Sequence, residues 1–325
     1  MNCILGTMNI NYPYSSNNSN SIEEYKKMIE KYITYVGKNA ILDTAYYYGN
    51  TSTEEILGNI IPELYIKPKI STKVNPWLDN DFTNGKLGQL SSIPFEKQLK
   101  TSLTNLRVES VEYLFLHCPD YETSIEETLE TCEKLWRKDK FDKFGLSNFS
   151  HTHLSQVIDV CENRGYNSPD VYQGMYNLIS RKIEEIFPLL NDYYIEFWAY
   201  NPLAGGLLTG KYNKETNIYN KNVESKNSRF KNNKIYQNIF WKEPIITHLE
   251  DFFKIEKCTE KSFHWLQHYS KMRKNDKIIL GASTVEQLET NLEIIKNFEN
   301  YSQDEINYLN NIYEPISQDS PNYYY

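Results

Sequence analysis

The feature that most constrains the fold is an alternation that repeats along the whole chain. Eight short runs rich in β-branched or aromatic residues each precede a stretch with helical periodicity. The runs are Cys3–Thr7, Ala40–Thr44, Ile70–Val74, Val111–His117, Lys143–Ser147, Val171–Tyr176, Tyr194–Tyr200 and Lys277–Gly281. Repeated strand–helix units build parallel sheets. Eight of them in 325 residues favour a closed (β/α)8 TIM barrel over an open doubly wound sheet.

The intervening stretches predict the helices and the domain boundaries. They are Ile22–Val36, a helix from Ser52, Phe95–Leu106, a helix from Ser124, a helix from about His151, Ile183–Leu190, Glu260–Arg273 and Val285–Asn297. Ser52 with Glu55, and Ser124 with Glu127, fit capping boxes. A polar stretch, Lys211–Asn238, predicts a long loop after the seventh strand, and Ser302–Tyr313 an extra C-terminal helix. Because no linker divides the chain, residues 1–325 are expected to form one domain.

Composition excludes several classes of protein. The chain has 35 basic and 43 acidic residues and a formal net charge of −8, so a nucleic-acid partner is not expected. It has no apolar run long enough to span a membrane and no secretory signal pattern at its start. The five cysteines are odd in number, widely spaced and free of CxxC, which favours packed thiols in a reducing, cytoplasmic compartment. His264 and His268 stand at i, i+4 without a third ligand, so we expect packing histidines and no metal.

Polar residues stand at the ends of three successive predicted strands. Asp43, Lys73 and His117 end the second, third and fourth runs, and Tyr48 follows in the loop after the second. In a barrel these four converge on one mouth. A nearby ammonium lowers the pKa of a tyrosine, a carboxylate keeps that ammonium charged, and a histidine can bind a carbonyl oxygen. Together they fit a carbonyl reduction with Tyr48 as general acid, which requires a hydride donor such as a nicotinamide cofactor.

Each of the four residues has a simpler interpretation on its own. Asp43 fits a helix or loop cap, and His117 fits a hydrogen-bonded core histidine. Lys73 fits a structural ion pair, or the Schiff-base lysine of an aldolase-type barrel. The occurrence of all four at successive strand ends favours the catalytic interpretation.

Later strand ends carry groups suited to holding a carboxamide and a flat ring. Ser147 and Asn148 follow the fifth strand, and Gln173 lies in the sixth. An amide side chain both donates and accepts hydrogen bonds, as a carboxamide ligand requires. Tyr200 ends the seventh strand and can stack on a ring.

Two further segments fit phosphate groups. After the seventh strand, NPLAGGLLTGK supplies Gly205, Gly206 and Gly210, where a backbone can approach a pyrophosphate closely, and then Lys211. After the eighth strand, GASTVEQLETN runs into a helix N-terminus, which favours a phosphate.

Taken together these segments resemble the aldo-keto reductase superfamily, and within it the aflatoxin-aldehyde reductase branch. The matching segments include ILGTM, LDTAYYYG, STKVNPW, LFLHCPD, FGLSNFS, VYQGMYNLISR, WAYNPLAGGLLTGKY, FWKE, ILGASTVEQLETNL and PNYYY, in the order of the family. The resemblance implies NADPH-dependent reduction of aldehydes and ketones in a (β/α)8 barrel without a metal, and a homodimer. It implies a catalytic tetrad of Asp43, Tyr48, Lys73 and His117, with His117 also contacting the substrate.

The resemblance also assigns cofactor and substrate contacts. The implied cofactor-binding residues are Ser147, Asn148, Gln173, Tyr200, Asn201, Leu203, Gly205, Gly206, Leu207, Lys211, Arg229, Ser283, Gln287 and Asn291. Tyr236 matches a tyrosine of the substrate pocket, although the loop between Arg229 and Tyr236 is shorter than that of the branch.

Two positions depart from the branch. Ile239 stands before FWKE where the branch carries an arginine, and Tyr325 stands at the tail where the branch ends PNYFR. Arginines there would hold a substrate carboxylate by charge-assisted hydrogen bonds. We therefore expect neutral or aromatic carbonyls to be preferred over carboxylated ones such as succinic semialdehyde.

Two other functions remain open at the level of sequence. A subunit that binds and senses a nicotinamide cofactor would resemble the potassium-channel β subunits, whose long N-terminal extension has no counterpart before the first strand. A degenerate structural barrel is the other alternative, and the intact tetrad argues against it.

Overall fold

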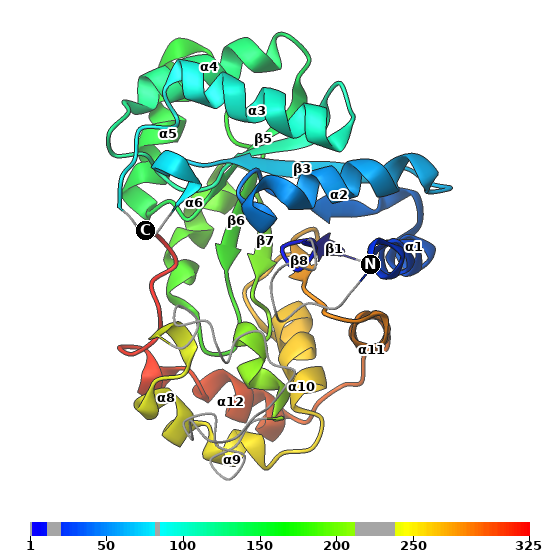
Figure 1. The fold of residues 1–325 in the computed structure, drawn as a ribbon. Coiled ribbons are helices and arrows are strands. Elements are labelled where there is room, and N and C mark those ends of the chain that lie inside the picture. Colours follow the sequence, from blue (N-terminus) through cyan, green and yellow to red (C-terminus); the bar gives the residue numbers. More distant parts are fainter. Residues whose placement is uncertain (1, 12–20, 82–84, 212–237) are drawn as a thin grey trace.

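The computed structural model describes residues 2–11, 21–81, 85–211 and 238–325, and it contains a closed barrel of eight parallel strands (Figure 1). Each strand pairs with its neighbours in sequence, and β8 pairs with β1. The strands are β1 Cys3–Gly6, β2 Ile41–Asp43, β3 Lys69–Val74, β4 Val111–Leu116, β5 Phe141–Ser147, β6 Val171–Met175, β7 Glu196–Tyr200 and β8 Lys277–Leu280. The predicted (β/α)8 barrel is confirmed.

Helices cover the outside of the strands (Figure 1). Those along the barrel are α1 Ile22–Val36, α2 Ser52–Ile60, α3 Ser92–Leu106, α4 Ile125–Trp136, α5 His151–Arg164, α6 Phe187–Asp192, α10 Cys258–His264 and α11 Val285–Lys296. Further helices are α8 Glu243–His248, α9 Glu250–Phe253 and α12 Gln303–Asn311, the last being the predicted extra C-terminal helix. Of the predicted long loop, residues 212–237 lie outside the described part of the chain.

Two packed layers follow from the two faces of each strand. On β4, Tyr113 and Phe115 belong to the cluster inside the barrel, whereas Leu114 and Leu116 belong to the layer beneath the helices. Trp198 of β7 lies 4.8 Å from the ring centroid of Tyr113 and 5.3 Å from that of Phe115. Aromatic and β-branched side chains together pack the barrel interior, and the polar residues predicted for catalysis lie at the carboxyl ends of the strands.

Two predicted helix details are wrong in part. Ser52 is the first residue of α2 and not its cap, because Thr51 precedes it in a left-handed conformation and the Ser52 hydroxyl donates to Gly49 O at 2.6 Å. The Ser52–Glu55 capping box is therefore absent. Ser124 does cap α4 by accepting from Glu127 N, but the Glu127 carboxylate accepts from Ser92 N of α3 instead of closing the box.

The predicted helix over Glu260–Arg273 is shorter than expected. It consists of α10 and a π turn, Trp265–Tyr269, after which Ser270 is extended. His264 is fully buried there and bonds Tyr301 Oη and Ile294 O, each at 2.9 Å, so it is a packing histidine as predicted.

All five cysteines are buried as free thiols. Burial raises the pKa of each of them, that of Cys3 to about 12. Within the described ranges, no three His, Cys, Asp or Glu side chains form a group that could hold a metal ion. The same part of the chain contains no helix with the length and apolar character needed to cross a membrane.

Candidate active site

The carboxylate of Asp43 lies at the centre of a buried hydrogen-bond network. The main chain of Asp43 is fixed first, since its carbonyl accepts from both the amide and the hydroxyl of Thr7, each at 2.9 Å. Its Oδ1 then accepts from Lys73 Nζ at 2.8 Å, Ser71 Oγ at 2.8 Å and Gln173 Nε2 at 3.0 Å. Three strands, β2, β3 and β6, are thus tied together at one carboxylate.

Lys73 is a fully buried cation with a complete set of acceptors. Its Nζ donates to both oxygens of Asp43 at 2.8 Å and to Thr44 O at 2.7 Å. Burial lowers the pKa of Lys73, and the Asp43 carboxylate opposes that shift. Three well-placed acceptors are what a buried ammonium needs to remain charged.

Tyr48 and His117 lie next to this ion pair. Lys73 Nζ is 5.1 Å from the centroid of the Tyr48 ring, and the rings of Tyr48 and His117 meet edge to face with centroids 5.9 Å apart. Gly49 makes the turn after Tyr48 with a φ of 58°, and a Cβ there would lie 2.6 Å from Ser52 Oγ. The turn that presents Tyr48 therefore requires glycine at its second position.

His117 is held as a neutral imidazole. Burial, and then the nearby Lys73 cation, place its pKa well below the usual value. Its amide donates to Val74 O at 2.9 Å, and its carbonyl accepts from Asn148 Nδ2 at 2.8 Å. The buried Nδ1 has no hydrogen-bond partner among the described residues. A buried polar atom left unsatisfied in this way is suited to a group that arrives with a ligand.

The predicted carboxamide-binding residues are in contact with the tetrad. Asn148 adopts a φ of 64°, and its Oδ1 accepts from Tyr200 Oη at 2.7 Å. Its Nδ2 also donates to Ser147 Oγ at 3.0 Å. The side-chain amide nitrogen of Gln173 donates to Asp43, and its side-chain oxygen can accept from another donor. The residues predicted to bind the carboxamide and those predicted for catalysis are therefore joined in one hydrogen-bond network.

The first predicted phosphate-binding segment, after β7, contains several residues with positive φ. Asn201, Gly205, Gly206 and Gly210 have φ values of 54°, 63°, 92° and 70°. Leu207 is fully buried, whereas Leu203 is partly buried and Lys211 exposed.

The start of α11 is the second of these segments. Thr284 caps the helix by accepting from Gln287 N at 3.2 Å, and Gln287 Oε1 accepts from Ser283 N at 3.0 Å. Asn291 lies one turn further on and is buried. Arg229 and Tyr236 lie outside the described residues.

The two departures from the branch lie in different settings. Ile239 is partly buried and packs against the main hydrophobic core. Tyr325 lies on the site itself: its amide donates to Asn148 O at 3.3 Å, and its carbonyl accepts from Tyr121 Oη. Figure 1 shows the C-terminal tail returning to the side of α5 and α6, where the Tyr323 hydroxyl accepts from His151 N at 3.2 Å.

Several residues at the site were not found from the sequence. Ser71 supplies a hydrogen bond to Asp43, and its position two residues before Lys73 on the same strand face could have revealed it. The ring of Trp77 lies 4.9 Å from that of His117 and 5.1 Å from that of Tyr47. Glu54, fully buried on α2, gave no pattern that distinguished it from a surface glutamate.

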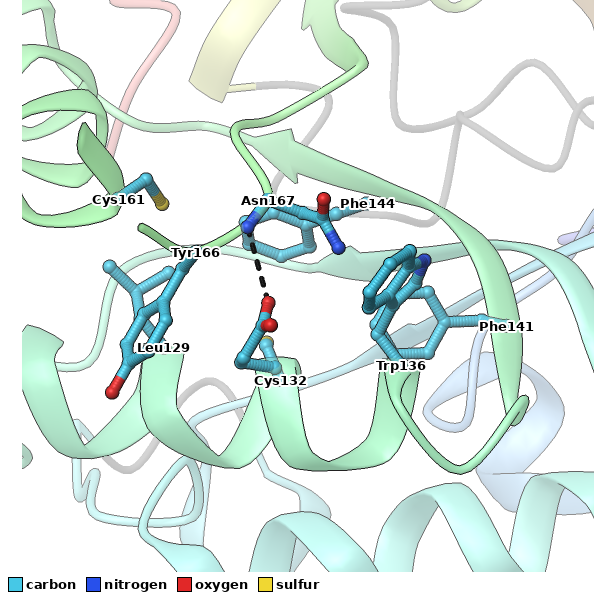
Figure 2. A pocket seen from close by; sticks show the side chains of 9 residues that line it. Leu129, Cys132, Trp136, Phe141, Phe144, Cys161, Tyr166 and Asn167 are labelled. Carbon is cyan, nitrogen blue, oxygen red and sulfur yellow. Dashed lines mark hydrogen bonds between the residues drawn. The ribbon is translucent and has the colours of Figure 1, made fainter. Parts of the chain in front are cut away.

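A separate pocket lies outside the barrel between α4, β5 and α5 (Figure 2). Its lining includes Cys132, Trp136, Phe144 and Cys161, and it contains none of the predicted site residues. The polar site at the strand ends is therefore distinct from this hollow.

Comparisons with known proteins agree with this geometry. A model described as "Aldo/keto reductase family" matches residues 2–314. Human aflatoxin B1 aldehyde reductase member 2 is 39% identical over 272 residues, which cover 77% of this chain and 72% of the relative. Aflatoxin B1 aldehyde reductase member 4, also human, is 37% identical over 272 residues, covering 77% of this chain and 78% of that protein.

Solved structures share the fold. A glycerol dehydrogenase from Gluconobacter oxydans superposes with a TM-score of 0.73 at 23% identity, covering 98% of this chain and 92% of that one. An aldo/keto reductase from Klebsiella pneumoniae, in complex with NADP and acetate, gives a TM-score of 0.66 at 19% identity, covering 99% and 93%. The chain is an enzyme of the oxidoreductase class and belongs to the aldo/keto reductase family.

Proposed function

We propose that this protein reduces aldehydes and ketones to alcohols with NADPH, and that Tyr48 is the general acid. The observation that carries the proposal is the buried Asp43–Lys73 pair, with Nζ 2.8 Å from both carboxylate oxygens and 5.1 Å from the Tyr48 ring. The aflatoxin-aldehyde reductase relatives support the class of substrate. The Klebsiella structures solved with NADP and with NADPH support the cofactor.

The four tetrad residues divide the proton chemistry. When bound, NADPH supplies the hydride. His117, kept neutral by burial, uses a ring N–H to hold the carbonyl oxygen of the substrate. Tyr48 gives its phenolic proton to that oxygen as the alkoxide forms. The Lys73 ammonium stabilises the resulting tyrosinate, and Asp43 keeps Lys73 charged and in place.

The residues around the tetrad fit the parts of the cofactor. Asn148, Ser147 and the free side-chain oxygen of Gln173 would hold the carboxamide, and Tyr200 would stack on the ring. Main-chain amides from Asn201 to Lys211 would bind the pyrophosphate, and the N-terminus of α11 the adenosine phosphate. We assign Arg229 to the cofactor and Tyr236 to the substrate on the family resemblance alone.

Replacing Tyr48 with phenylalanine tests the proposal. Removing a general acid typically costs 10²–10⁴-fold in rate, so NADPH consumption with a panel of aldehydes should fall by about that factor. The control is NADPH binding followed by fluorescence, which Tyr48→Phe should leave intact. Tight NADPH binding by the wild type without turnover of any aldehyde would instead support a cofactor-sensing subunit.

The absence of two arginines predicts which carbonyls are preferred. Ile239 packs in the core, and Tyr325 presents its backbone to Asn148 and Tyr121, so neither supplies a cation for a substrate carboxylate. We expect kcat/KM for a neutral aromatic aldehyde to exceed that for succinic semialdehyde by about tenfold or more. A preference for succinic semialdehyde would overturn this part of the proposal.

We also propose that residues 1–325 form one barrel domain that works as a homodimer in the cytoplasm. The family resemblance supports the dimer, and the five free cysteines support a reducing compartment. Sedimentation equilibrium tests the dimer, and limited proteolysis that yields no stable half-size fragment tests the single domain.

A further inference from the structure

A buried carboxyl group lies directly behind the catalytic lysine. Glu54 of α2 is fully buried, and its Oε1 accepts from the hydroxyl of Thr72. Thr72 and Lys73 are neighbours on β3, so their side chains point to opposite faces of the strand. Lys73 points into the barrel toward Asp43, while Thr72 points outward to α2. Glu54 and the ion pair are therefore separated by the thickness of one strand.

Close packing of two helices brings Glu54 to Ser102. A Cβ on Gly58 of α2 would lie 1.9 Å from Asn105 O of α3, so the two helices touch at their backbones. Glu54 lies one turn before Gly58, and Ser102 lies one turn before Asn105. Ser102 is close enough to affect the pKa of Glu54.

Two adjacent polar atoms in this layer have no partner. Among the described residues, neither Glu54 Oε2 nor Ser102 Oγ makes a hydrogen bond of normal geometry, and both are buried. Leaving a buried acceptor and a buried hydroxyl unsatisfied is costly. A carboxylate has no hydrogen to give, whereas a carboxylic acid does. A hydrogen bond between them would satisfy both atoms, with the proton supplied either by the Ser102 hydroxyl to a carboxylate or by a carboxylic acid to Ser102 Oγ. Because Glu54 is fully buried and no cation of the described residues is bonded to its carboxyl group, the neutral acid avoids the cost of an isolated buried charge.

We propose that Glu54 is a positioning residue for Lys73, resting as a neutral carboxylic acid that donates to Ser102 and becoming a carboxylate behind Lys73 as the pH rises. The role in the reaction rests on the proposed function above. The protonation of Glu54 rests on its full burial and on the lack, among the described residues, of a cation bonded to its carboxyl group.

The electrostatic surroundings agree with this assignment. Burial raises the pKa of Glu54 to about 7, against the hydroxyls of Thr72 and Ser102 and the charge of Lys73, which lower it. The buried side chains of α3 are Phe95, Gln98, Leu99, Ser102 and Leu106, none of which is charged. On α1 the buried ionisable groups are the hydroxyls of Tyr25 and Tyr32, and Lys26 pairs with Glu63. Of the described residues, Lys73 is thus the ion that acts on Glu54.

Ionisation of Glu54 changes the field that Tyr48 feels. A negative charge behind Lys73 offsets part of the ammonium that stabilises tyrosinate, so it raises the pKa of Tyr48. Carbonyl reduction needs Tyr48 protonated, and its rate declines above that pKa. Ionised Glu54 therefore extends reduction to higher pH.

The kinetic test compares the wild type with Glu54→Gln, which has the shape of the neutral acid but cannot ionise. The test measures kcat/KM for a neutral aldehyde as a function of pH, with saturating NADPH. In the variant, the fall of kcat/KM at high pH should begin about 0.5 to 1 pH unit lower than in the wild type, so that at a given high pH kcat/KM is about three- to tenfold lower. The matched control is Glu133→Gln. Glu133 is buried on α4 beside the outer pocket and accepts from Arg137 Nε and Asn167 N. That variant should keep the wild-type profile, and a Glu54→Gln profile that also coincides with the wild type would overturn the role in the reaction.

An infrared measurement tests the protonation without any turnover. The wild type near pH 5.5 should show the carbonyl stretch of a buried carboxylic acid, which disappears above about pH 8 and is missing in Glu54→Gln. In Ser102→Ala the band should move to higher frequency because its acceptor is gone. The absence of such a band, or its persistence in Glu54→Gln, would overturn the proposal. If no aldehyde is reduced while the band behaves as expected, the proposed function fails and the neutral Glu54 stands.

Discussion

The two sides of the barrel mouth are built in different ways. At the ends of β2, β3 and β4, side chains converge: Asp43 and Lys73 are buried, and each is hydrogen-bonded through every polar atom of its head group. After β7 and β8, the groups proposed to bind the cofactor belong to the backbone. They lie in the turn at Gly205 and Gly206, where φ is positive, and at the N-terminus of α11. The first side is expected to govern chemistry and stability together, and the second to govern mainly cofactor affinity.

The largest expected effect comes from breaking the ion pair. Asp43→Asn leaves the Lys73 ammonium buried beside a neutral amide, and removing one partner of such a pair typically costs about 3–5 kcal/mol. The midpoint of urea unfolding should fall accordingly, and reduction should be lost at neutral pH.

A double variant separates the two consequences. Asp43→Leu with Lys73→Met removes both charges, and apolar replacements of a buried pair are often neutral or stabilising. We expect its unfolding midpoint to return close to that of the wild type while reduction stays absent. A double variant as unstable as Asp43→Asn would show that packing, and not charge, explains the loss.

An intermediate effect is expected on the other side of the mouth. Gly206 has a φ of 92°, where an alanine is strained by about 1–2 kcal/mol. Gly206→Ala should weaken NADPH binding by about tenfold, measured by fluorescence titration, with kcat changed less than twofold. Loss of kcat with unchanged NADPH affinity would contradict the proposed division of the mouth.

The smallest effect is expected at the cap of α11. Thr284→Ala removes the side chain that accepts from Gln287 N, which typically costs about 1 kcal/mol of helix stability. The midpoint of thermal unfolding should fall by about 1–2 °C in a chain of this length, and kcat for a neutral aldehyde should stay the same. Thr284→Ser keeps the hydroxyl and is the control that should retain the wild-type Tm.

The sequence predicted the barrel well because its signal is repeated and local. Helix α1 was predicted with its exact bounds, and each strand within a few residues. The four residues of the tetrad could be singled out because a charged or polar side chain is uncommon at the end of an otherwise apolar strand. Its roles and those of the cofactor residues remain proposals.

The misses have two physical causes, which are local backbone conformation and contact between segments far apart in the chain. The Ser52 capping box failed because Thr51 takes a left-handed conformation that the residue pattern does not encode. No pattern in the sequence indicated that the backbone of Tyr325 contacts Asn148, because that contact joins residues far apart in the chain. Glu54 was missed because only the packing of α2 on α3 and β3 buries it.

The five buried thiols have a practical consequence for measuring these effects. Each is enclosed and holds its proton tightly, so little reactive thiolate forms at neutral pH. A cysteine introduced at an exposed position such as Tyr194, which is 91% accessible, should react alone with a maleimide dye. The protein is thus ready for attachment of a single fluorophore or spin label without first removing its native cysteines.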